Sequence, residues 1–298
     1  MMDYSEHNEG GINTEGGENL EKAMVPGFVP GGESAKNGPV SGGEIPTGED
    51  SGGRNSGKSI LEVRDIHKSF GKKEVVKGIS FSMKNGEIMG LLGPNGAGKT
   101  TSFYMIVGFY KPTSGNVLVN GNSITGLPMY KRARLGLAYL PQEPSIFRKL
   151  SVEKNILAVL ESRKELTPAE RKNKMDELIE RFSISHIRKQ PAYTLSGGER
   201  RRTEIARALA GDPYFLLLDE PFAGIDPIAV YEIKKIISKL SQDGIGILIT
   251  DHNVRDTLEI TQRACIISDG RIVVEGSKEE ILQSEIARKI YLGEQFSM

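Results

Sequence analysis

Two stretches of the sequence fit the spacing G-x-x-x-x-G-K-[ST], which is typical of loops that bind phosphate groups. They are GGRNSGKS at 52–59 and GPNGAGKT at 93–100. In such a loop, backbone N–H groups ring the phosphates, and a helix begins at once with the positive end of its dipole directed at them. The predicted chemistry is therefore nucleotide binding, and the flanking sequence must decide which stretch supports it.

The flanking sequence favours the second stretch. The run 87–92, which is apolar after Glu87 and typical of a buried strand, leads into Gly93, and residues 99–106 continue as a helix. Around GGRNSGKS the order is inverted, because EIPTGED precedes it and the strand-like run 60–63 follows. We therefore interpret 52–59 as part of a linker and expect one phosphate loop in this chain.

The residues of the second loop have separate predicted roles. Gly96 and Gly98 carry no Cβ, so the backbone can approach the phosphates closely. Lys99 is expected to reach the β and γ phosphates of the nucleotide, and Thr100 to place its hydroxyl on Mg²⁺. The residues predicted to bind the nucleotide here are Gly93, Asn95, Gly96, Gly98, Lys99, Thr100 and Thr101.

Two adjacent carboxylates could bind metal and activate water. Asp219 and Glu220 follow the apolar run 215–218, and a buried strand places its last side chains at the carboxyl edge of the sheet, where α/β proteins bind ligands. Asp219 is predicted to hold Mg²⁺, and Glu220 to orient and polarise the attacking water, because phosphoryl transfer to water requires both. The alternative is a strand that ends in two solvated acids, and the phosphate loop in the same chain argues against it.

Three further side chains are candidates for the same site. His252 follows a strand-like run at 246–249 and is predicted to sense the γ-phosphate, although a lone histidine is usually structural. Gln142 follows the run 137–140 and could reach Mg²⁺ or the attacking water. Phe70 could stack on adenine, and the competing interpretation is an aromatic residue of the core.

A second turn with glycines opens onto a helix at LSGGE, residues 195–199. The free N–H groups at the start of such a helix form an anion site, so this turn is predicted to face a phosphate. The alternative is an ordinary helix start with a serine cap. The residues concerned are Ser196, Gly197, Gly198 and Glu199.

The elements that must position these residues alternate between strands and helices, which indicates an α/β fold with a largely parallel core sheet. Short apolar runs bounded by turn residues are typical of strands buried on both faces. Expected strands, besides 60–63 and 87–92, are 116–119, 137–140, 215–218, 246–249 and 264–267. Expected helices, besides 99–106, are 151–162, 167–183, 199–211, 227–241 and 253–261. The stretch 146–195 is mostly helical and polar, so we expect an insertion into the core.

Composition limits the class of protein. Lys+Arg and Asp+Glu both total 39, which gives a net charge of zero and argues against a nucleic-acid partner. Residues 1–57 are rich in Gly, Glu and Ser, and we expect a disordered acidic tail there. The single cysteine, Cys265, lies in an apolar run and is expected to be a buried small hydrophobe. No run approaches the roughly 18 apolar residues needed to span a bilayer.

The motifs, in this order, resemble the ATP-binding cassette (ABC) family. In that resemblance GPNGAGKTT is the phosphate loop, Gln142 the Q-loop, LSGGE the signature, FLLLDE the metal strand, AGID with Asp226 the D-loop, and His252 the switch histidine. The resemblance covers roughly 60–298. It implies an α/β RecA-like P-loop NTPase core with an antiparallel β region, formed by 58–145 and 196–298, and an inserted helical subdomain at about 146–195.

The same resemblance implies a cofactor and a partner. Two chains would form a homodimer that sandwiches two molecules of ATP, each with Mg²⁺, and each site would pair one chain's phosphate loop with the other chain's LSGGE. The second anion site would then serve the nucleotide of the partner chain. Because Glu220 and His252 are both present, ATP hydrolysis is expected.

Within the family, several stretches are similar to the ATP-binding subunits of lipopolysaccharide exporters. They include LPQEPSIFRKLSVEKNILAVLE at 140–161, ERRR after LSGG, and YLGEQF at 291–296. This similarity implies two transmembrane permease subunits as partners, contacted through Phe147 and Arg148, and a place on the cytoplasmic face of the inner membrane. The family's adenine-stacking residue is usually Tyr, and Phe70 keeps only the ring.

Other functions are left open by the resemblance. An ATPase subunit of a branched-chain amino-acid importer is the nearest alternative, and the stretch around Phe147 argues against it. A soluble ABC ATPase of translation or DNA repair would usually carry two cassettes or long coiled coils, and this chain has neither pattern. A regulatory module without hydrolysis would be favoured by loss of Glu220 or His252.

Overall fold

The computed structural model describes residues 59–292. Residues 52–58 of the first glycine-rich stretch, the expected acidic tail 1–57 and residues 293–296 of YLGEQF lie outside the described residues. The boundary between tail and cassette, and the limits of the helical subdomain, therefore stay predictions. The first described strand, β1, begins at Ile60, directly after GGRNSGKS.

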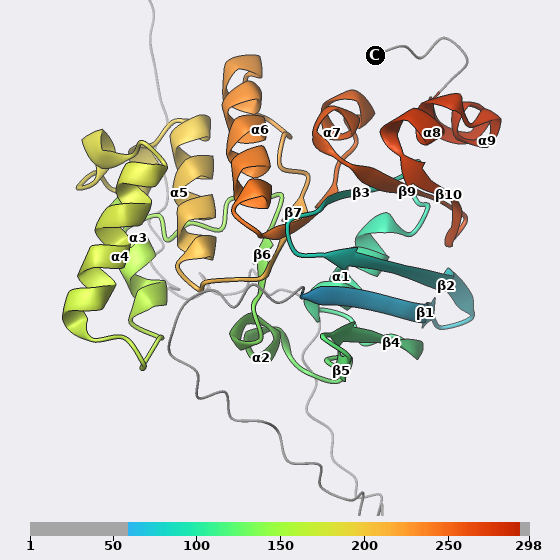
Figure 1. The fold of residues 1–298 in the computed structure, drawn as a ribbon, viewed down its shortest axis with the longest axis horizontal. Coiled ribbons are helices and arrows are strands. Elements are labelled where there is room, and N and C mark those ends of the chain that lie inside the picture. The colour runs from blue at the N-terminus through green and yellow to red at the C-terminus, as the bar shows by residue number, and fades with distance from the viewer. Residues whose placement is uncertain (1–58, 293–298) are drawn as a thin grey trace, which may run out of the picture. The chain divides into compact units, whose positions relative to one another are not determined.

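A six-stranded sheet forms the centre of the described chain, with strand order β10-β9-β3-β8-β7-β6 (Figure 1). Its neighbouring strands from β9 to β6 are parallel, and β10 pairs with β9 in the antiparallel sense. The strands are β3 (Ile88–Leu92), β6 (Leu137–Leu140), β7 (Phe215–Asp219), β8 (Gly246–Thr250), β9 (Arg263–Ser268) and β10 (Arg271–Ser277). Every residue of β3, β7 and β8 is buried, as expected for strands covered on both faces.

A second sheet is antiparallel, with strand order β2-β1-β4-β5. Its strands are β1 (Ile60–Phe70), β2 (Lys73–Lys84), β4 (Ser114–Val119) and β5 (Asn122–Ser123). The run 60–63 was expected to be a short strand, and β1 instead continues to Phe70 and forms a hairpin with β2, which the patterning did not predict. Charged side chains on the exposed side of this hairpin interrupt the apolar runs, so the sequence shows no continuous apolar stretch that would predict the two long strands.

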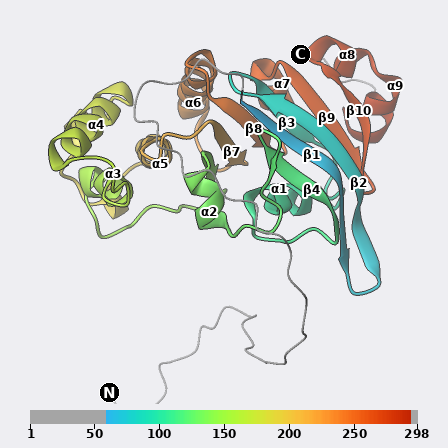
Figure 2. The same cartoon turned by 60° about the horizontal axis from the view of Figure 1, so that its bottom comes forward.

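Helix α1 (Lys99–Val107) lies between the two sheets (Figure 2) and contacts β1, β2 and β8. Its buried residues Phe103, Met105 and Ile106 share one apolar core with residues of both sheets. The phosphate loop therefore begins a helix that is enclosed on two sides, which fixes the direction of its N-terminus.

The helical part of the chain consists of α3 (Val152–Leu160), α4 (Pro168–Arg181) and α5 (Gly197–Leu209), which contact one another. Two 3-10 turns, Ser185–Ile187 and Ala192–Thr194, connect α4 to α5. Helix α4 begins with Thr167, Pro168 and Glu170 as a capping box, as the sequence predicted. Helix α5 also contacts β6 and α6, so it joins these helices to the central sheet.

The remaining helices are α2 (Met129–Arg134), α6 (Pro227–Gln242), α7 (Val254–Ile260), α8 (Lys278–Gln283) and α9 (Glu285–Ala287), followed by one π-helical turn, Arg288–Leu292. Patterning did not predict α2, α8 or α9, because segments this short carry too few turns for a 3.6-residue period. The expected α/β class with a largely parallel core sheet and an antiparallel β region is confirmed.

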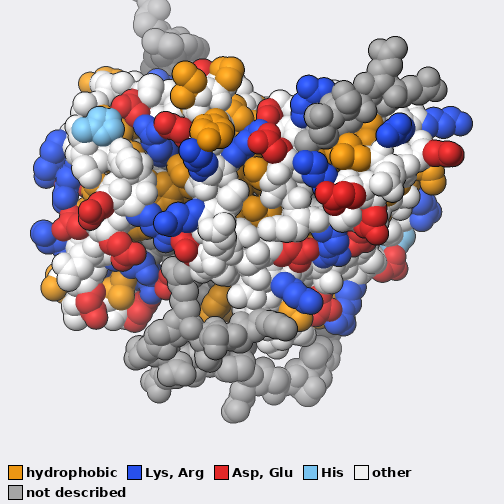
Figure 3. Space-filling view, turned by 45° about the horizontal axis from the view of Figure 1, so that its top comes forward, with side chains coloured by type: hydrophobic (Ala, Val, Ile, Leu, Met, Phe, Trp, Pro, Cys, Tyr) orange, Lys and Arg blue, Asp and Glu red, His pale blue; other side chains and the backbone are white. Residues whose placement is uncertain are grey.

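Three further expectations can be compared with the described residues. Cys265 is buried, and burial raises the pKa of its thiol. Within 59–292, no helix has the length and apolar character needed to cross a bilayer. The face drawn in Figure 3 carries basic side chains interspersed with acidic ones, rather than the single-sign stripe that is typical of nucleic-acid binding.

Candidate functional site

The phosphate loop connects β3 to α1 and depends on glycines at three positions. Gly93, Gly96 and Gly98 have φ angles of 147°, 78° and 103°, in the region that L-residues rarely adopt. A Cβ on Gly93 would lie 2.1 Å from the backbone oxygen of Ile267, so close packing against β9 also requires glycine there. At Gly96 no atom lies within 4 Å of such a Cβ, so only the backbone conformation demands glycine.

Lys99, the first residue of α1, folds back over this loop. Its Nζ donates hydrogen bonds to the carbonyl oxygens of Gly93 at 2.6 Å and Pro94 at 3.0 Å. Burial lowers the pKa of this lysine, and the charge of Glu220 acts in the opposite direction. The ammonium group thus lies inside the loop where a phosphate would bind, and Thr100 beside it is exposed.

The strand order places the other candidates at the same edge of the sheet as the loop. Strands β3, β8, β7 and β6 are consecutive neighbours and parallel, so their carboxyl ends lie side by side. Asp219 ends β7, His252 follows β8, and Gln142 follows β6. The sequence prediction that these side chains share one edge with the phosphate loop agrees with this topology.

Glu220 is the point at which three of these side chains meet. Its Oε2 accepts a hydrogen bond of 2.6 Å from the Gln142 amide, and its Oε1 lies 2.6 Å from Nε2 of His252. The backbone of Glu220 has a φ of 45°, unusual for a residue other than glycine, and its N–H donates to the Thr250 carbonyl at 2.7 Å. This turn directs the carboxylate toward the side chains that follow β6 and β8.

Asp219 lies beside this group in a more enclosed environment. The residue is 4% exposed, and in the described part of the chain its carboxylate accepts one long hydrogen bond, 3.4 Å, from the Tyr139 hydroxyl. Burial, and then the charge of Glu220, raise the pKa of Asp219 to about 6. The charge of Arg201 acts in the opposite direction, and a divalent cation would favour the ionised carboxylate further.

These residues fit a magnesium ion that arrives with a nucleotide. Mg²⁺ usually binds one or two carboxylates together with water and substrate phosphates, rather than a cage made only of protein groups. Among residues 59–292, no three His, Cys, Asp or Glu side chains form such a cage. Asp219 and the Thr100 hydroxyl would hold the ion, with Gln142 in reach of its water shell, as the sequence predicted.

The LSGGE turn forms the start of α5, and its Ser196 and Glu199 hydrogen-bond each other in a capping box. The Ser196 side chain accepts from the Glu199 N–H, and the Glu199 carboxylate accepts from Ser196 N–H at 2.9 Å and from its hydroxyl at 2.7 Å. Gly198 packs against α6, because a Cβ there would lie 3.2 Å from the Cβ of Ala229. Asp226 caps α6 in the same way by accepting from the Ala229 N–H at 2.9 Å. Both interpretations of LSGGE remain compatible with this geometry, since a helix cap and an anion site use the same N-terminus.

Phe70 lies at the end of β1 with 46% of its surface exposed, so it is not a core aromatic. Its ring meets Tyr110 edge-on, with ring centroids 5.5 Å apart, and Lys68 Nζ lies 5.2 Å from the Phe70 centroid. An exposed ring fixed by two neighbours can stack on a planar ligand.

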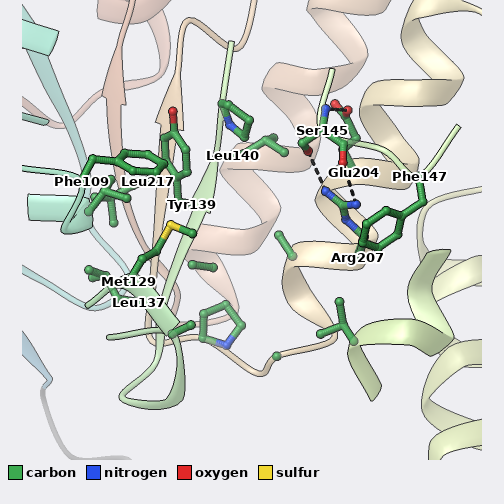
Figure 4. Close-up of a pocket in the computed structure, with 18 residues that line it drawn as sticks. Phe109, Met129, Leu137, Tyr139, Leu140, Ser145, Phe147, Glu204, Arg207 and Leu217 are labelled. Atoms are coloured by element: carbon green, nitrogen blue, oxygen red, sulfur yellow. Dashed lines mark hydrogen bonds between the residues drawn. The ribbon is translucent and has the colours of Figure 1, made fainter. Parts of the chain in front are cut away.

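A pocket of about 460 Å³ lies against β6, the edge strand of the six-stranded sheet (Figure 4). All four residues of β6 line it, together with Met129 of α2, Phe147 and Arg207 of α5. Phe147 is 52% exposed, and its ring lies 5.1 Å from the Arg207 guanidinium carbon. Arg148 is exposed beside Phe147 but does not line the pocket.

Helix α5 holds the segment that forms this pocket wall. The Glu204 carboxylate accepts from the Ser145 and Ile146 N–H groups at 2.7 and 3.2 Å. Arg207 donates to the Ser145 carbonyl and hydroxyl at 2.8 and 2.6 Å, and Arg201 donates to the Pro141 carbonyl at 2.9 Å. The helix that begins with LSGGE thus anchors the segment on both sides of Gln142.

Two residues of the site were missed by the sequence reasoning. Tyr139, interpreted only as part of a strand, contacts Asp219, and burial raises the pKa of its hydroxyl, so the group stays protonated. Asp251, which is 3% exposed, accepts from the Phe222 and Asn253 N–H groups at 3.3 and 2.8 Å and so shapes the turn of His252. Both residues could have been found from their positions, because Tyr139 lies near the end of β6 and Asp251 directly follows β8.

Comparison with known proteins gives consistent results. The family described as ABC transporter matches residues 76–223. The lipopolysaccharide export system ATP-binding protein LptB of Haemophilus influenzae is 55% identical over 240 residues, which are 80% of this chain and 100% of that protein. The protein of the same name from Escherichia coli K12 is 51% identical over the same shares.

Solved structures agree with this fold. The ADP conformation of an ATP-binding cassette of an ABC transporter is 28% identical, covers 79% of this chain and 99% of its own, and has a TM-score of 0.70. A nucleotide-free ATP-binding cassette from an ABC transporter is also 28% identical. It covers 79% of this chain and 100% of its own, with a TM-score of 0.70. The fold and the sequence therefore point to one family.

Proposed function

This chain belongs to the ABC transporter family, and we propose that it is the ATP-hydrolysing subunit of a lipopolysaccharide exporter. ATP hydrolysis is the activity of ABC transporter cassettes. The observation that supports it most directly here is the meeting of Gln142 and His252 on the Glu220 carboxylate. The export function is supported by the 51–55% identity to proteins named for that system.

The residues of the site have separate roles in the proposed reaction. Lys99 and the N–H groups of the phosphate loop bind and neutralise the β and γ phosphates. The Glu220 carboxylate accepts a hydrogen bond from the attacking water and orients it, while His252 and Gln142 fix the position of that carboxylate. Asp219 and Thr100 would hold Mg²⁺, which would supply positive charge against the charge that develops on the phosphate oxygens.

A second copy of the chain would complete the site. Gly197 and Gly198 begin α5, and N–H groups in the first turn of a helix have no intrahelical acceptor. These two groups, with the Ser196 side chain, would therefore bind the γ-phosphate of the nucleotide held by the partner chain. Asp226 begins α6 close to this surface, because Gly198 packs on Ala229 one turn later. ATP would thus join two chains, and hydrolysis would release them.

The pocket beside β6 would receive a segment of a transmembrane permease subunit. Its wall is apolar, with Phe109, Met129 and Phe147 exposed at 49%, 42% and 52%, which is typical of a helix-binding surface. Arg148 next to Phe147 would contact the same subunit. Since β6 lines the pocket and leads directly to Gln142, partner docking and the water-positioning group share one strand. The chain would then work at the cytoplasmic face of the inner membrane.

The catalytic assignment predicts the behaviour of Glu220→Gln. The amide can still accept a hydrogen bond but cannot take a proton, so turnover of ATP is expected to fall by about 10²–10⁴-fold. ATP binding is expected to persist, and the ATP-bound chain should elute as a dimer in size-exclusion chromatography. Glu180→Gln, an exposed carboxylate change on α4, is the matched control and should leave turnover unchanged. Normal hydrolysis by Glu220→Gln would refute the role given to Glu220.

Capture of partners from detergent-solubilised membranes tests the export assignment. Wild-type chain, Phe147→Ala and Tyr231→Ala would be used as baits, and the captured proteins identified by mass spectrometry. Tyr231 is a similarly exposed ring, at 57%, which lies on α6 and does not line the pocket. We expect two related permease subunits of a lipopolysaccharide exporter with wild type and Tyr231→Ala, and their loss with Phe147→Ala.

Other outcomes would change the conclusion in defined ways. Capture of amino-acid permeases would retain the ATPase and reject the export function. Capture of only soluble proteins would reject the transporter role. Equal capture by wild type and Phe147→Ala would reject the pocket as the docking site while leaving the partner's identity intact.

A further inference from the structure

Tyr139 has two different environments at the two ends of one side chain. Its ring lines the pocket beside β6, and its hydroxyl donates to Oδ2 of Asp219 at 3.4 Å. Figure 4 shows the ring next to Phe109 and Leu217, with the hydroxyl directed away from Met129 and Leu137. Among the described residues that line the pocket, Tyr139 is the one with a hydrogen bond to this carboxylate.

The phosphate-loop helix also lies close to this tyrosine. Tyr104 of α1 interacts electrostatically with the Tyr139 hydroxyl. The Phe109 ring bridges the two tyrosines, with centroids 5.2 Å from Tyr104 and 5.4 Å from Tyr139. A shift of the Tyr139 ring would therefore change its contacts with both Asp219 and α1, because packed side chains of a protein interior cannot move independently.

The other polar groups of the pocket wall have different partners. Glu204 and Arg207 contact the backbone and hydroxyl of Ser145 and Ile146. They position the wall segment, which ends near Gln142, but they do not touch Asp219. Among the described residues that line the pocket, Tyr139 therefore provides the direct side-chain contact with this carboxylate.

We propose that Tyr139 is a positioning residue that makes the metal affinity of Asp219 depend on whether the pocket is filled. The proposal rests on the proposed function, in which Asp219 binds the metal of the nucleotide and the pocket receives a partner. A side chain that enters the pocket presses on the Tyr139 ring and changes the long hydroxyl–carboxylate hydrogen bond. By linkage, metal–nucleotide binding changes the affinity of the pocket for its occupant by the same factor.

The pocket can be filled without a partner protein. Ala208 of α5 lines it, and Ala208→Cys provides a thiol that benzyl methanethiosulfonate converts to a mixed disulfide inside the pocket. The chain's only natural cysteine, Cys265, is buried with a raised pKa and is not expected to react. Dithiothreitol removes the benzyl group, so each protein is measured with the pocket filled and then emptied again.

The readout is the dissociation constant of Mn²⁺, a paramagnetic substitute for Mg²⁺, in the complex with a non-hydrolysable ATP analogue. It is measured by electron paramagnetic resonance on the full chain, with Tyr139 present and with Tyr139→Phe. We expect benzylation to change the constant by about fivefold or more with Tyr139, and by less than about 1.5-fold with Phe. Affinity for the analogue without metal should not change, which a general loss of structure would not reproduce.

Each other outcome overturns a defined statement. Equal changes with Tyr139 and with Phe would show that occupancy acts by another route, and no change with Tyr139 would show that the pocket and Asp219 are independent. Either result rejects this proposal while the ATPase assignment stands. Failure of the unlabelled chain to bind the analogue would reject the proposed function and the inference together.

Discussion

Glu220 has a backbone conformation that a residue with a Cβ seldom adopts, with a φ of 45°. Such positions cost about 1–3 kcal/mol and persist where the surrounding structure enforces them. Here the Thr250 carbonyl fixes the Glu220 N–H, and Gln142 and His252 fix its carboxylate. In the proposed reaction this carboxylate is oriented before substrate binds, which would reduce the reorganisation needed in the transition state.

At the same scale, Phe70 is predicted to carry much of the affinity for the adenine ring. Phe70→Ala removes the stacking surface, so the dissociation constant for ATP should rise about tenfold, since stacking of a base on an aromatic ring contributes about 1–3 kcal/mol. Phe70→Tyr should bind like wild type, because it keeps the ring. Titration calorimetry of both variants is the measurement, and unchanged affinity of Phe70→Ala would place adenine elsewhere.

Among the elements, α5 connects the most parts of the site. It begins with the predicted partner-nucleotide turn, and its side chains Arg201, Glu204 and Arg207 anchor the segment around Gln142 and the pocket wall. These contacts fix the position of the pocket wall relative to that turn. Helix α2 likewise connects the pocket with the phosphate-loop helix, because Met129 lines the pocket and Arg132 donates a hydrogen bond to the Met105 carbonyl of α1.

Arg132 is predicted to fix the end of the phosphate-loop helix. It is 1% exposed and donates to the carbonyls of Met105 and Ile106 at the end of α1, and to those of Thr125 and Leu127. Arg132→Met leaves these carbonyls unpaired, so the free energy of unfolding should fall by about 3 kcal/mol. Arg132→Lys should lose less. Because the chain has no tryptophan, urea unfolding would be followed by circular dichroism, and a loss below about 1 kcal/mol would contradict this role.

Glu199 is predicted to stabilise the start of α5 in a pH-dependent way. Hydrogen bonds from the Ser196 side chain, and then its backbone, lower the pKa of this carboxyl. A lowered folded-state pKa gives stability that is present above the ordinary glutamate pKa and is lost as the pH falls through the lowered value. Glu199→Ala should therefore cost about 1 kcal/mol at pH 7 and less at about pH 3. Thermal unfolding at both pH values measures this, and an equal cost at both would exclude an effect of ionisation.

Across the whole molecule, the site is assembled from segments far apart in the sequence. Phe70 comes from the antiparallel sheet, Lys99 from the loop after β3, and Gln142, Glu220 and His252 follow three other strands. The pocket lies against β6, the edge strand of the six-stranded sheet, and Gln142 follows that strand, so the predicted nucleotide and partner surfaces share β6. This arrangement suits a protein whose proposed work is to connect ATP hydrolysis with a partner's movement.

Removal of residues 1–57 is predicted to leave ATP turnover within about twofold of the full chain. The physical reason is that every residue assigned to catalysis or nucleotide binding lies within 59–292. Turnover of the truncated and full chains at saturating ATP is the measurement. A large loss would mean that the interpretation of 52–59 as a linker was wrong.

The sequence alone determined the α/β class and the order of candidate side chains along the chain, and it predicted which of the two matching loops binds phosphate. These follow from local rules, because strand burial, glycine turns and helix caps depend on neighbours in sequence. The hairpin of β1 and β2, the contact of Tyr139 with Asp219, and the convergence of Gln142 and His252 on Glu220 were decided by the tertiary structure. They depend on strand order and on the left-handed turn at Glu220. A single sequence shows local periodicity, but it does not show which distant segments pair with one another.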